Sequence, residues 1–266
     1  MRCFALLKKA PLAGAFFVSV AWGLPAQALC PAPDKLSTAR VERVIDGDTL
    51  HLADGRRVRL IGVNTPERAR REQPAEPFAE AARERLRQLV TANGGRVDLL
   101  PGRQARDRHG RLLAHAYDAH GRSWEAQLLA EGLGYQVAVA PNAALADCLR
   151  QAERRARAAG AGLWRQPAWQ RPEQLRRGGF ALIRARVGGV ERNGGGLWIE
   201  LEGGLVLRVE PKLLRLFDLA ALQRLPGRRV ETRGWVVDRA RQGQVDKEQA
   251  RWMLPLTHPF MLDVLP

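Results

Sequence analysis

The sequence predicts an α+β chain of two consecutive small β-barrels, and three observations lead to this fold class. The chain has 266 residues, of which 45% are hydrophobic, so two small domains can each bury a core. Short runs rich in β-branched and aromatic residues alternate with Gly-containing turns in both halves. In each half an amphipathic helical pattern follows the third such run, which gives the order β-β-β-α-β-β twice. That order is typical of the OB-type barrel, which often binds oligonucleotides across one face.

The elements of the first half begin at Val41. The segment 41–52 is strand-like but interrupted at Asp46-Gly47, and an Asp-Gly turn at 53–56 leads back into a strand over 57–63. The further predicted elements are a helix over 76–89, strands over 97–100 and 112–117, a short helix over 124–132, and a longer helix with Asn142 as its N-cap and an end near Gly160.

The second half follows residues 165–179, which contain prolines and arginines without periodicity and are predicted to form a linker. Its predicted elements are strands over 180–191, 197–201 and 205–209, a helix over 211–225, and strands over 229–237 and 251–256. The predicted organisation is therefore a lead-in over 29–40, a first domain over 41–164 with three helices, the linker, and an OB-like second domain over 180–266.

The N-terminal segment over 1–28 has the pattern of an export signal. Arg2, Lys8 and Lys9 precede a short apolar stretch, and Ala26-Gln27-Ala28 is a small-x-small cleavage site. The apolar stretch is too short for a stable membrane span. We expect cleavage near Ala28 and a monomeric protein, not inserted in the membrane, that is exported to a periplasm or secreted.

Cleavage leaves two cysteines, Cys30 and Cys148, in an oxidising compartment. We expect them to form a disulfide, which in the chain-entropy model stabilises the fold by about 4–5 kcal/mol. The alternative is two unpaired thiols, one in a terminal segment and one buried in a helix.

The formal net charge of +15 favours the capture of polyanions. Nucleic acid is the first candidate, and an anionic membrane surface is the second. The basic residues are mostly arginines, whose planar guanidinium binds phosphate through two parallel hydrogen bonds.

Three polar clusters of the first half carry the candidate chemistry. They are Ile45-Asp46-Gly47-Asp48-Thr49, the segment from Arg59 to Glu67, and Asp107-Arg108-His109-Gly110-Arg111. Each alone fits a turn or a solvated loop. Their appearance together, in this order and between the strands of one small barrel, favours a shared site.

With these clusters the segment over about 41–164 resembles the staphylococcal nuclease (thermonuclease) family. The resemblance extends to Glu125-Ala126, to Gly132-Leu133, and to the segment from Ala152-Glu153 to Gly162-Leu163-Trp164. It implies a single OB barrel with three helices and a Ca²⁺-dependent cleavage of DNA and RNA that is largely indifferent to sequence.

The resemblance also implies the metal ligands. Asp48 supplies a carboxylate oxygen, position 64 a side-chain oxygen, and Thr65 its backbone carbonyl, which are donors that a hard cation prefers. Asp46 is expected either to support this site from behind or only to shape the hairpin.

By the same resemblance, Arg59 and Arg111 clamp the phosphate and stabilise the charge of the transition state. Glu67 positions or deprotonates the attacking water. Arg108 and His109 lie beside a phosphate, with solvated surface as the alternative.

This sequence departs from the family at two places. Asn64 stands where the family has an aspartate, so the site loses one negative charge. We expect weaker metal binding and a less strict preference for Ca²⁺, so that Mg²⁺ or another divalent cation becomes an alternative. The segment 135–140 has alanines where the family has tyrosines, and stacking on such rings contributes about 1–3 kcal/mol per base.

The second domain combines arginines with tryptophans, which suits single-stranded nucleic acid. The candidate residues are Arg184, Arg186, Arg192, Arg208, Arg228, Arg229, Arg233, Trp198, Trp235 and Trp252. The alternative is that the tryptophans belong to the core and the arginines to a solvated face.

The sequence thus predicts an exported metal-dependent nuclease that hydrolyses phosphodiester bonds in DNA and/or RNA with little sequence specificity. The alternative is a catalytically weak or inactive nucleic-acid-binding protein on the same fold, which only Asn64 favours. A surface adhesion protein would account for the charge and the export but for none of the three clusters.

Overall fold

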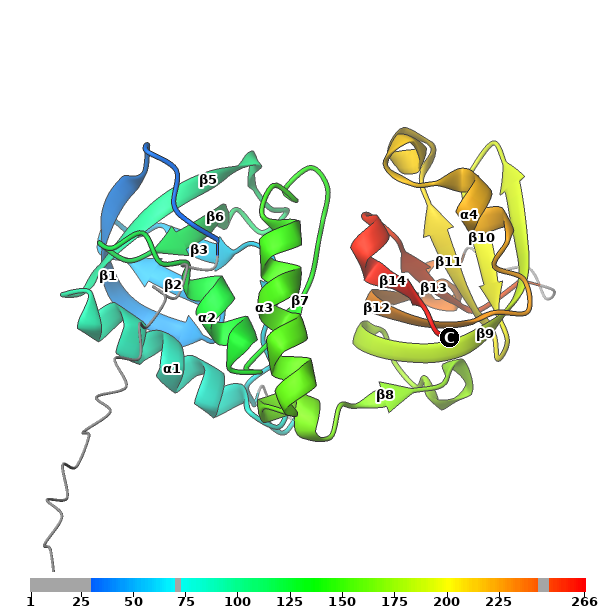
Figure 1. Ribbon diagram of the computed structural model, residues 1–266, viewed down its shortest axis with the longest axis horizontal. Helices are drawn as coiled ribbons and strands as arrows, with labels where there is room; N and C mark the ends of the chain where they lie inside the picture. The colour runs from blue at the N-terminus through cyan, green and yellow to red at the C-terminus, as the bar shows by residue number, and fades with distance from the viewer. Residues whose placement is uncertain (1–29, 70–72, 244–248) are drawn as a thin grey trace, which may run out of the picture.

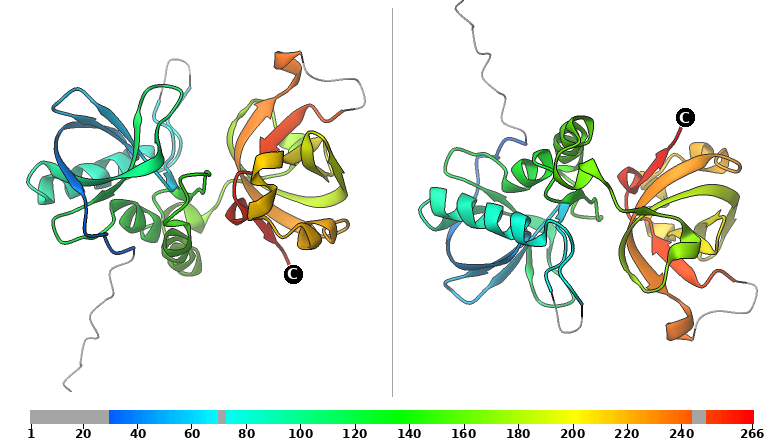
Figure 2. Two further views of the ribbon diagram at one scale, coloured as in Figure 1. Left: turned by 90° about the horizontal axis from the view of Figure 1, so that it is seen from above. Right: turned by 90° about the horizontal axis from the view of Figure 1, so that it is seen from below.

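The computed structural model describes residues 30–69, 73–243 and 249–266. The predicted signal peptide over 1–28 lies outside the described residues. Two domains lie side by side, each built on a strongly curved sheet (Figures 1 and 2). In the described part of the chain, no helix combines the length and the apolar character needed to span a bilayer.

The first domain is a closed barrel with helices packed around it. Its elements are β1 (Ser37–Asp46), β2 (Thr49–Leu52), β3 (Arg57–Leu60), β4 (Val63–Asn64), α1 (Ala79–Ala92), β5 (Arg96–Arg106), β6 (Leu112–Tyr117), α2 (Trp124–Ala130), β7 (Tyr135–Gln136), α3 (Ala146–Ala159) and the 3₁₀ turn η1 (Gly162–Arg165). The barrel closes in the order β1-β2-β3-β6-β5. Its neighbours are antiparallel except for β3 and β6, which run parallel. This confirms the predicted barrel.

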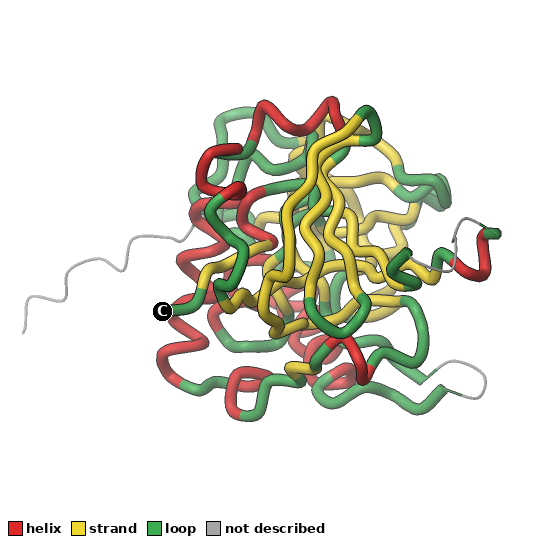
Figure 3. The backbone as a smooth tube through the Cα atoms, turned by 90° about the vertical axis from the view of Figure 1, so that its right-hand side faces the viewer, coloured by secondary structure: helices red, strands yellow, loops and turns green. Residues whose placement is uncertain are grey.

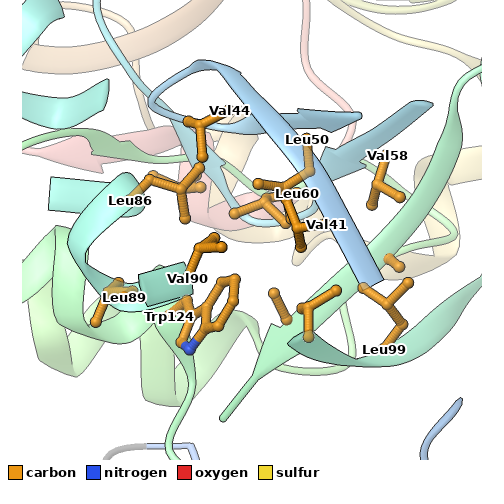
Figure 4. Close-up of a cluster of buried hydrophobic side chains, with 14 of the residues drawn as sticks. Val41, Val44, Leu50, Val58, Leu60, Leu86, Leu89, Val90, Leu99 and Trp124 are labelled. Carbon is orange, nitrogen blue, oxygen red and sulfur yellow. The ribbon is translucent and has the colours of Figure 1, made fainter. Parts of the chain in front are cut away.

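The core of this domain fills the barrel and the space beneath α1. Trp124, the first residue of α2, is fully buried, and Figure 4 shows its ring among side chains from several strands and from α1. Leu86 and Val90 of α1 belong to the same cluster because residues three and four apart lie on one side of a helix. The hydroxyl of Ser123 begins α2 by accepting a hydrogen bond from the backbone N–H of Ala126.

The second domain repeats the strand connectivity of the first. Its elements are β8 (Trp169–Gln170), η2 (Pro172–Gln174), β9 (Gly179–Asn193), β10 (Gly196–Leu201), β11 (Leu205–Val209), η3 (Pro211–Leu216), α4 (Leu219–Gln223), β12 (Arg229–Asp238), η4 (Ala240–Gln242), β13 (Trp252–Pro255), η5 (Pro259–Met261) and β14 (Leu262–Val264). The pairings run β9-β10-β11-β13-β12 and return from β12 to β9, again with one parallel pair, β11 and β13. Figure 3 shows the strands on this side of the molecule, in yellow, running beside one another. The strand pairings of the second domain therefore follow the order of the first domain, and its assignment as an OB-like unit stays a prediction.

The two domains meet along α3 and β7. The guanidinium of Arg233 on β12 donates to both carboxylate oxygens of Glu153 on α3, at 2.6 and 2.7 Å, and both side chains are 3% exposed. Glu153 also accepts a hydrogen bond of 2.7 Å from the backbone N–H of Gln136 in β7. Beside them the ring of Tyr135 stacks on Phe180, with centroids 5.6 Å apart. The second domain thus packs directly against β7.

A second ion cluster lies nearby on the same interface. Glu231 of β12 accepts hydrogen bonds of 2.7 Å from Arg157 on α3 and 2.6 Å from Arg184 on β9. Burial on its own raises the pKa of Glu231, but these hydrogen bonds outweigh it and hold the pKa below its usual value. Arg150 of α3 also pairs with Asp263 on β14.

Cys30 and Cys148 form a disulfide, with their Cα atoms 5.4 Å apart. It ties the chain in front of β1 to α3. Since α3 also carries Glu153, one helix holds both the N-terminal lead-in and the second domain.

The structure corrects three predicted boundaries. The third helix begins at Ala146, because the side chain of Asn142 instead binds the backbone of Gln104 through two hydrogen bonds of 2.9 Å. The predicted helix over 211–225 is broken into η3 and α4, because Phe217 is buried in an extended conformation and Asp218 caps a new helix. The predicted linker contains η2 and also β8, which pairs with β9.

Candidate active site

The connection between β1 and β2 brings Asp46-Gly47-Asp48 close to α1 and to the segment after β4. A Cβ atom on Gly47 would lie 2.6 Å from the Cβ of Ala82 and 2.8 Å from the side chain of Thr65. Such distances leave no room for a side chain, so the close approach of this turn requires glycine. Asp46 stabilises the turn by accepting a hydrogen bond of 3.1 Å from the backbone N–H of Asp48.

Asp48 is buried and held by several donors. Its Oδ2 accepts hydrogen bonds from the backbone N–H and the hydroxyl of Thr65, at 2.8 and 2.9 Å. Its Oδ1 accepts one from the hydroxyl of Thr49 at 3.2 Å. A carboxylate fixed in this way keeps one orientation, which favours a ligand or a charge partner over a solvated surface group.

Arg59 lies between Asp48 and Asn64. Its Nη1 lies 3.0 Å from Oδ2 of Asp48, and its Nη2 donates to Oδ1 of Asn64 at 3.0 Å. Nη1 also donates to the carbonyls of Leu60 and Val63, at 2.9 and 2.8 Å. The structure therefore brings together three of the residues predicted for the site.

Two carboxylates, Asp46 and Asp48, and the guanidinium of Arg59 act on one another in this region. Burial, followed by the negative charge of Asp48, raises the pKa of the Asp46 carboxyl to about 6. A cation placed here would relieve that repulsion.

The donor set fits a hard divalent cation. Asp48 and Asn64 offer oxygens, and the guanidinium of Arg59 already stands between them as a positive group. No three His, Cys, Asp or Glu side chains of the described residues gather as a metal-binding group, and the candidate set instead combines one carboxylate with an amide and a backbone carbonyl.

Glu67 lies two residues beyond Thr65, at the start of the loop that leads to α1. Its backbone N–H donates to Glu76 at 2.9 Å, and the backbone N–H of Glu76 donates back to the carbonyl of Glu67 at 2.9 Å. These bonds close the base of the loop, and the Glu67 side chain is exposed two residues after the buried Thr65.

Arg111 lies on the same outer side of the barrel as Arg59. In the parallel pair of β3 and β6, Val58 is opposite Leu112 and Arg59 is opposite Leu113. Because side chains alternate along a strand, Arg111 and Arg59 point to the same face, two positions apart. Arg111 donates through Nε to Oδ2 of Asp107 at 2.7 Å.

The turn that carries Arg111 is repeated at the other end of β6. In the turn Asp107–Arg111, the aspartate accepts hydrogen bonds of 2.9 Å from the backbone N–H groups two and four residues on. In the turn Asp118–Arg122 the aspartate accepts the same two bonds, also at 2.9 Å, and Arg122 donates to it through Nε at 2.6 Å. The contact between Asp107 and Arg111 therefore belongs to a turn type that this chain uses twice.

Arg108 and His109 lie exposed at the tip of the first of these turns, and Nε of Arg108 donates to Nε2 of His109 at 3.2 Å. Their position beside the Arg111 side of the barrel agrees with a role next to the substrate, and their exposure agrees equally with solvated surface.

Sequence patterns did not reveal the donors that orient Asp48. Thr65 was expected to contribute only its carbonyl, yet its N–H and hydroxyl hold the carboxylate, and Thr49 does the same from the other side. Asp107 was also missed as the partner of Arg111. The repeated Asp-x-His-Gly-Arg sequence was the one signal that could have indicated it.

The predicted nucleic-acid face of the second domain is wrong for Arg233, which is buried against Glu153 in the interface. The guanidinium of Arg184 is also engaged within the protein, because it forms an ion pair with Glu231. Trp252 belongs to the core, as the alternative interpretation held. Trp198 is half-buried, and the guanidinium of Arg208 lies 5.0 Å from the centre of its ring.

Comparison with known proteins assigns the first domain. The model of the family described as staphylococcal nuclease homologue matches residues 57–166. The thermonuclease of Staphylococcus intermedius is 35% identical over 127 residues, which cover 47% of this chain and 74% of that protein. Endonuclease YncB of Bacillus subtilis (strain 168) is 34% identical over 134 residues, covering 49% of this chain and 63% of that protein. The thermonuclease of Staphylococcus hyicus is 31% identical over 130 residues, covering 48% and 75%.

The family model includes Arg59 and Arg111, and together with these relatives it shows that the chain belongs to the staphylococcal nuclease family.

Proposed function

We propose that this protein is an exported, metal-dependent endonuclease that hydrolyses phosphodiester bonds in DNA and/or RNA with little sequence specificity. The observation that carries the proposal is the buried set of Asp48, Arg59 and Asn64 on the same side of the barrel as Arg111, in a chain of this family.

Asp48, Asn64 and the carbonyl of Thr65 would hold the cation, with Ca²⁺ as the first candidate and Mg²⁺ as the alternative. The bound ion supplies a Lewis acid that polarises the phosphoryl oxygen. Occupation of these oxygens would release Arg59 from Asp48 and Asn64, so that its guanidinium becomes available to the substrate.

Arg59 and Arg111 bind the scissile phosphate and stabilise the additional negative charge of the transition state. Glu67, exposed two residues after Thr65, accepts a proton from the attacking water. The water oxygen forms a bond to phosphorus, the bond from phosphorus to one ester oxygen breaks, and the departing oxygen takes up a proton.

The low sequence specificity follows from the kind of group involved. Arg59, Arg111 and Arg108 address phosphates, which every sequence presents alike. Ala138 is buried, and no aromatic ring stands there to stack on a base. Export accords with the disulfide of Cys30 and Cys148, since such bonds persist in oxidising compartments.

The test uses supercoiled plasmid and single-stranded RNA with Ca²⁺, Mg²⁺ or chelator. We expect degradation that chelator abolishes and that Glu67→Gln lowers by about a hundredfold or more in kcat. Glu76→Gln is the matched control, because it removes one carboxylate charge nearby, keeps an oxygen that can accept from the Glu67 N–H, and leaves the Glu67 carboxylate in place. Cleavage that survives both chelator and Glu67→Gln would overturn the proposal.

The second candidate is a nucleic-acid-binding protein without catalysis, which the missing carboxylate at Asn64 favours. It would bind the same substrates but leave the plasmid intact with every metal.

A further inference from the structure

A groove of about 530 Å³ opens between the two domains, on the side of the loop that precedes α3. The first domain contributes Arg103 and Gln104 of β5 and Pro141, and the second domain contributes Lys212, Arg215 and Leu216 of η3. Figure 1 shows this loop and the turn in front of α4 facing each other across the space between the domains. We call this feature the interdomain groove.

The groove is positively charged. Among the described residues that line it, three carry a fixed positive charge, Arg103, Lys212 and Arg215, and no Asp or Glu is present. Lys212 has a partner, because its Nζ lies 2.7 Å from Glu210, and its side chain is 76% exposed. A pair so exposed contributes little and exchanges easily with another anion.

Arg103 and Arg215 are both exposed, and neither has a hydrogen-bond or carboxylate partner within the described parts of the chain. Two guanidinium groups from different domains, neither of them paired within the described parts of the chain, therefore line one groove. Their forked donors match phosphate oxygens.

Apolar surface lies beside these charges. Leu216 lines the groove and is 40% exposed, and Val139, one residue before the lining residue Ala140, is also 40% exposed. A duplex turns its phosphates outward and hides its base faces, whereas a single strand presents both. Cations for the backbone with apolar surface for the bases therefore fit a single strand better than a duplex.

The first domain lines the groove with two segments, one from β5 and one from the chain after β7, and both segments continue along the chain to residues of the candidate active site. Along β5, Arg103 is followed by Arg106 and then by the turn that holds Arg111, and three extended residues span roughly 10 Å. On the other side, Tyr135 pairs with Asn64, and the chain continues from there to Pro141. The groove thus lies a few nucleotides away from the candidate phosphate clamp.

We propose that the interdomain groove binds the single-stranded continuation of the nucleic-acid substrate, with Arg103 and Arg215 as its phosphate contacts. This inference rests on the proposed function, because the occupant is the substrate of that site. The second domain then contributes to substrate affinity through η3.

The test is the double variant Arg103→Ala/Arg215→Ala in the full chain. The control Arg155→Ala/Arg177→Ala removes the same charge at two exposed residues that do not line the groove. Binding is measured by fluorescence anisotropy in chelator, without cleavage, on single-stranded DNA of about 6 and about 30 nucleotides, lengths that bracket the usual site of an OB fold.

We expect the groove variant to raise Kd for the longer strand by about tenfold, and for the shorter strand by less than about twofold. The slope of log K against log salt should fall by roughly 1.4, because each lost phosphate contact on a single strand removes about 0.7. The control should change both by much less. An unchanged Kd of the groove variant, or an equal loss of affinity in the groove and control variants, would overturn the proposal that the groove binds the strand.

Cleavage of plasmid by the wild-type protein is scored separately. If the wild-type protein does not cleave plasmid but the groove variant still binds the longer strand more weakly, the proposed nuclease function is contradicted and the proposed role of the groove in binding is supported. Circular dichroism of both double variants checks that each is folded.

Discussion

Asn64 and Asp48 both contact the guanidinium of Arg59. The side chain of Asn64 is a neutral amide, whereas an aspartate at this position would add a second negative charge to the site. An amide oxygen is a competent ligand for a hard cation. The number of charged ligands nevertheless sets affinity, so this residue limits how tightly the site can hold its metal.

Asn64→Asp should therefore strengthen metal binding. We expect the Ca²⁺ concentration for half-maximal activity to fall by about tenfold, a change of about 1.4 kcal/mol. The variant keeps the oxygen that accepts from Arg59, so the fold should be undisturbed. Titration of plasmid cleavage with Ca²⁺ measures the effect, and an unchanged midpoint would show that position 64 does not ligate.

The candidate site was predictable from sequence only where a residue type and its motif carry the function together. The order of the three clusters that contain Asp48, Arg59 and Arg111 indicated a shared site, and the resemblance to the family supplied the roles predicted for these residues. The donors from Thr65 could not be foreseen, because they depend on how closely the turn at Gly47 approaches that residue in space.

At the scale of elements, β6 is flanked by two turns of the same kind. Arg111 precedes the strand and Arg122 follows it, and each is bound by the aspartate four residues earlier. The strand between them spans about 20 Å at about 3.3 Å per residue. The chain therefore supplies its own control for the role of Arg111.

Arg111→Ala should lower kcat by about a hundredfold or more, the usual cost of losing one donor to a transition-state oxyanion. Arg122→Ala should leave kcat within about twofold, although each variant loses one charge-assisted hydrogen bond of similar worth, about 1.5–3 kcal/mol. Steady-state kinetics and denaturant unfolding of both proteins separate the two effects. Equal losses of kcat would mean that Arg111 serves only the turn.

Most elements followed from periodicity, since strands and helices with one buried face repeat their apolar residues at fixed intervals. The prediction of one helix over 211–225 was wrong, because the spacing of its apolar residues did not reveal that the helix is interrupted at Phe217. Phe217 is apolar at a helical position, yet it is buried with an extended backbone while Asp218 caps the next helix. Spacing alone cannot distinguish these arrangements, because both bury the same side chains.

At the scale of the whole molecule, the buried ion pair of Arg233 and Glu153 joins residues 80 positions apart. No local pattern reports such a contact, which is why Arg233 was expected on a binding face. Removing one member of a buried pair leaves the other charge without compensation.

Arg233→Ala should destabilise the protein by about 3–5 kcal/mol. Arg233→Met/Glu153→Gln should recover a large part of that loss, because neither side chain then carries a buried charge. Urea unfolding of the wild type, Arg233→Met, Glu153→Gln and the double variant gives the coupling energy. Additive single losses would show that the pair does not act as a unit.

The acid stability of the interface should depend on Glu231. Its pKa is lower in the folded protein than the ordinary 4.5, so its ionised form stabilises the fold above that value and the contribution is lost as pH falls through the lowered pKa. Glu231→Gln should cost about 1–3 kcal/mol at neutral pH and progressively less below about pH 4. Thermal unfolding across this range measures the gap, with Glu200→Gln as an exposed control on β10. A gap that is constant with pH would contradict the assignment.

The pairing of β4 with β7 links the candidate site to the domain interface. Asn64 lies opposite Tyr135, the ring of Tyr135 stacks on Phe180, and the carbonyl of Gln136 accepts a hydrogen bond from Arg233 of the second domain. A fragment cut before β9 would bare the ring of Tyr135 and leave the Glu153 carboxylate without Arg233. It would lose cooperativity and activity even if the second domain never touched nucleic acid. We therefore expect the half that matches thermonucleases to depend on the second domain for its stability, so that its chemistry is best studied by point substitutions in the intact chain.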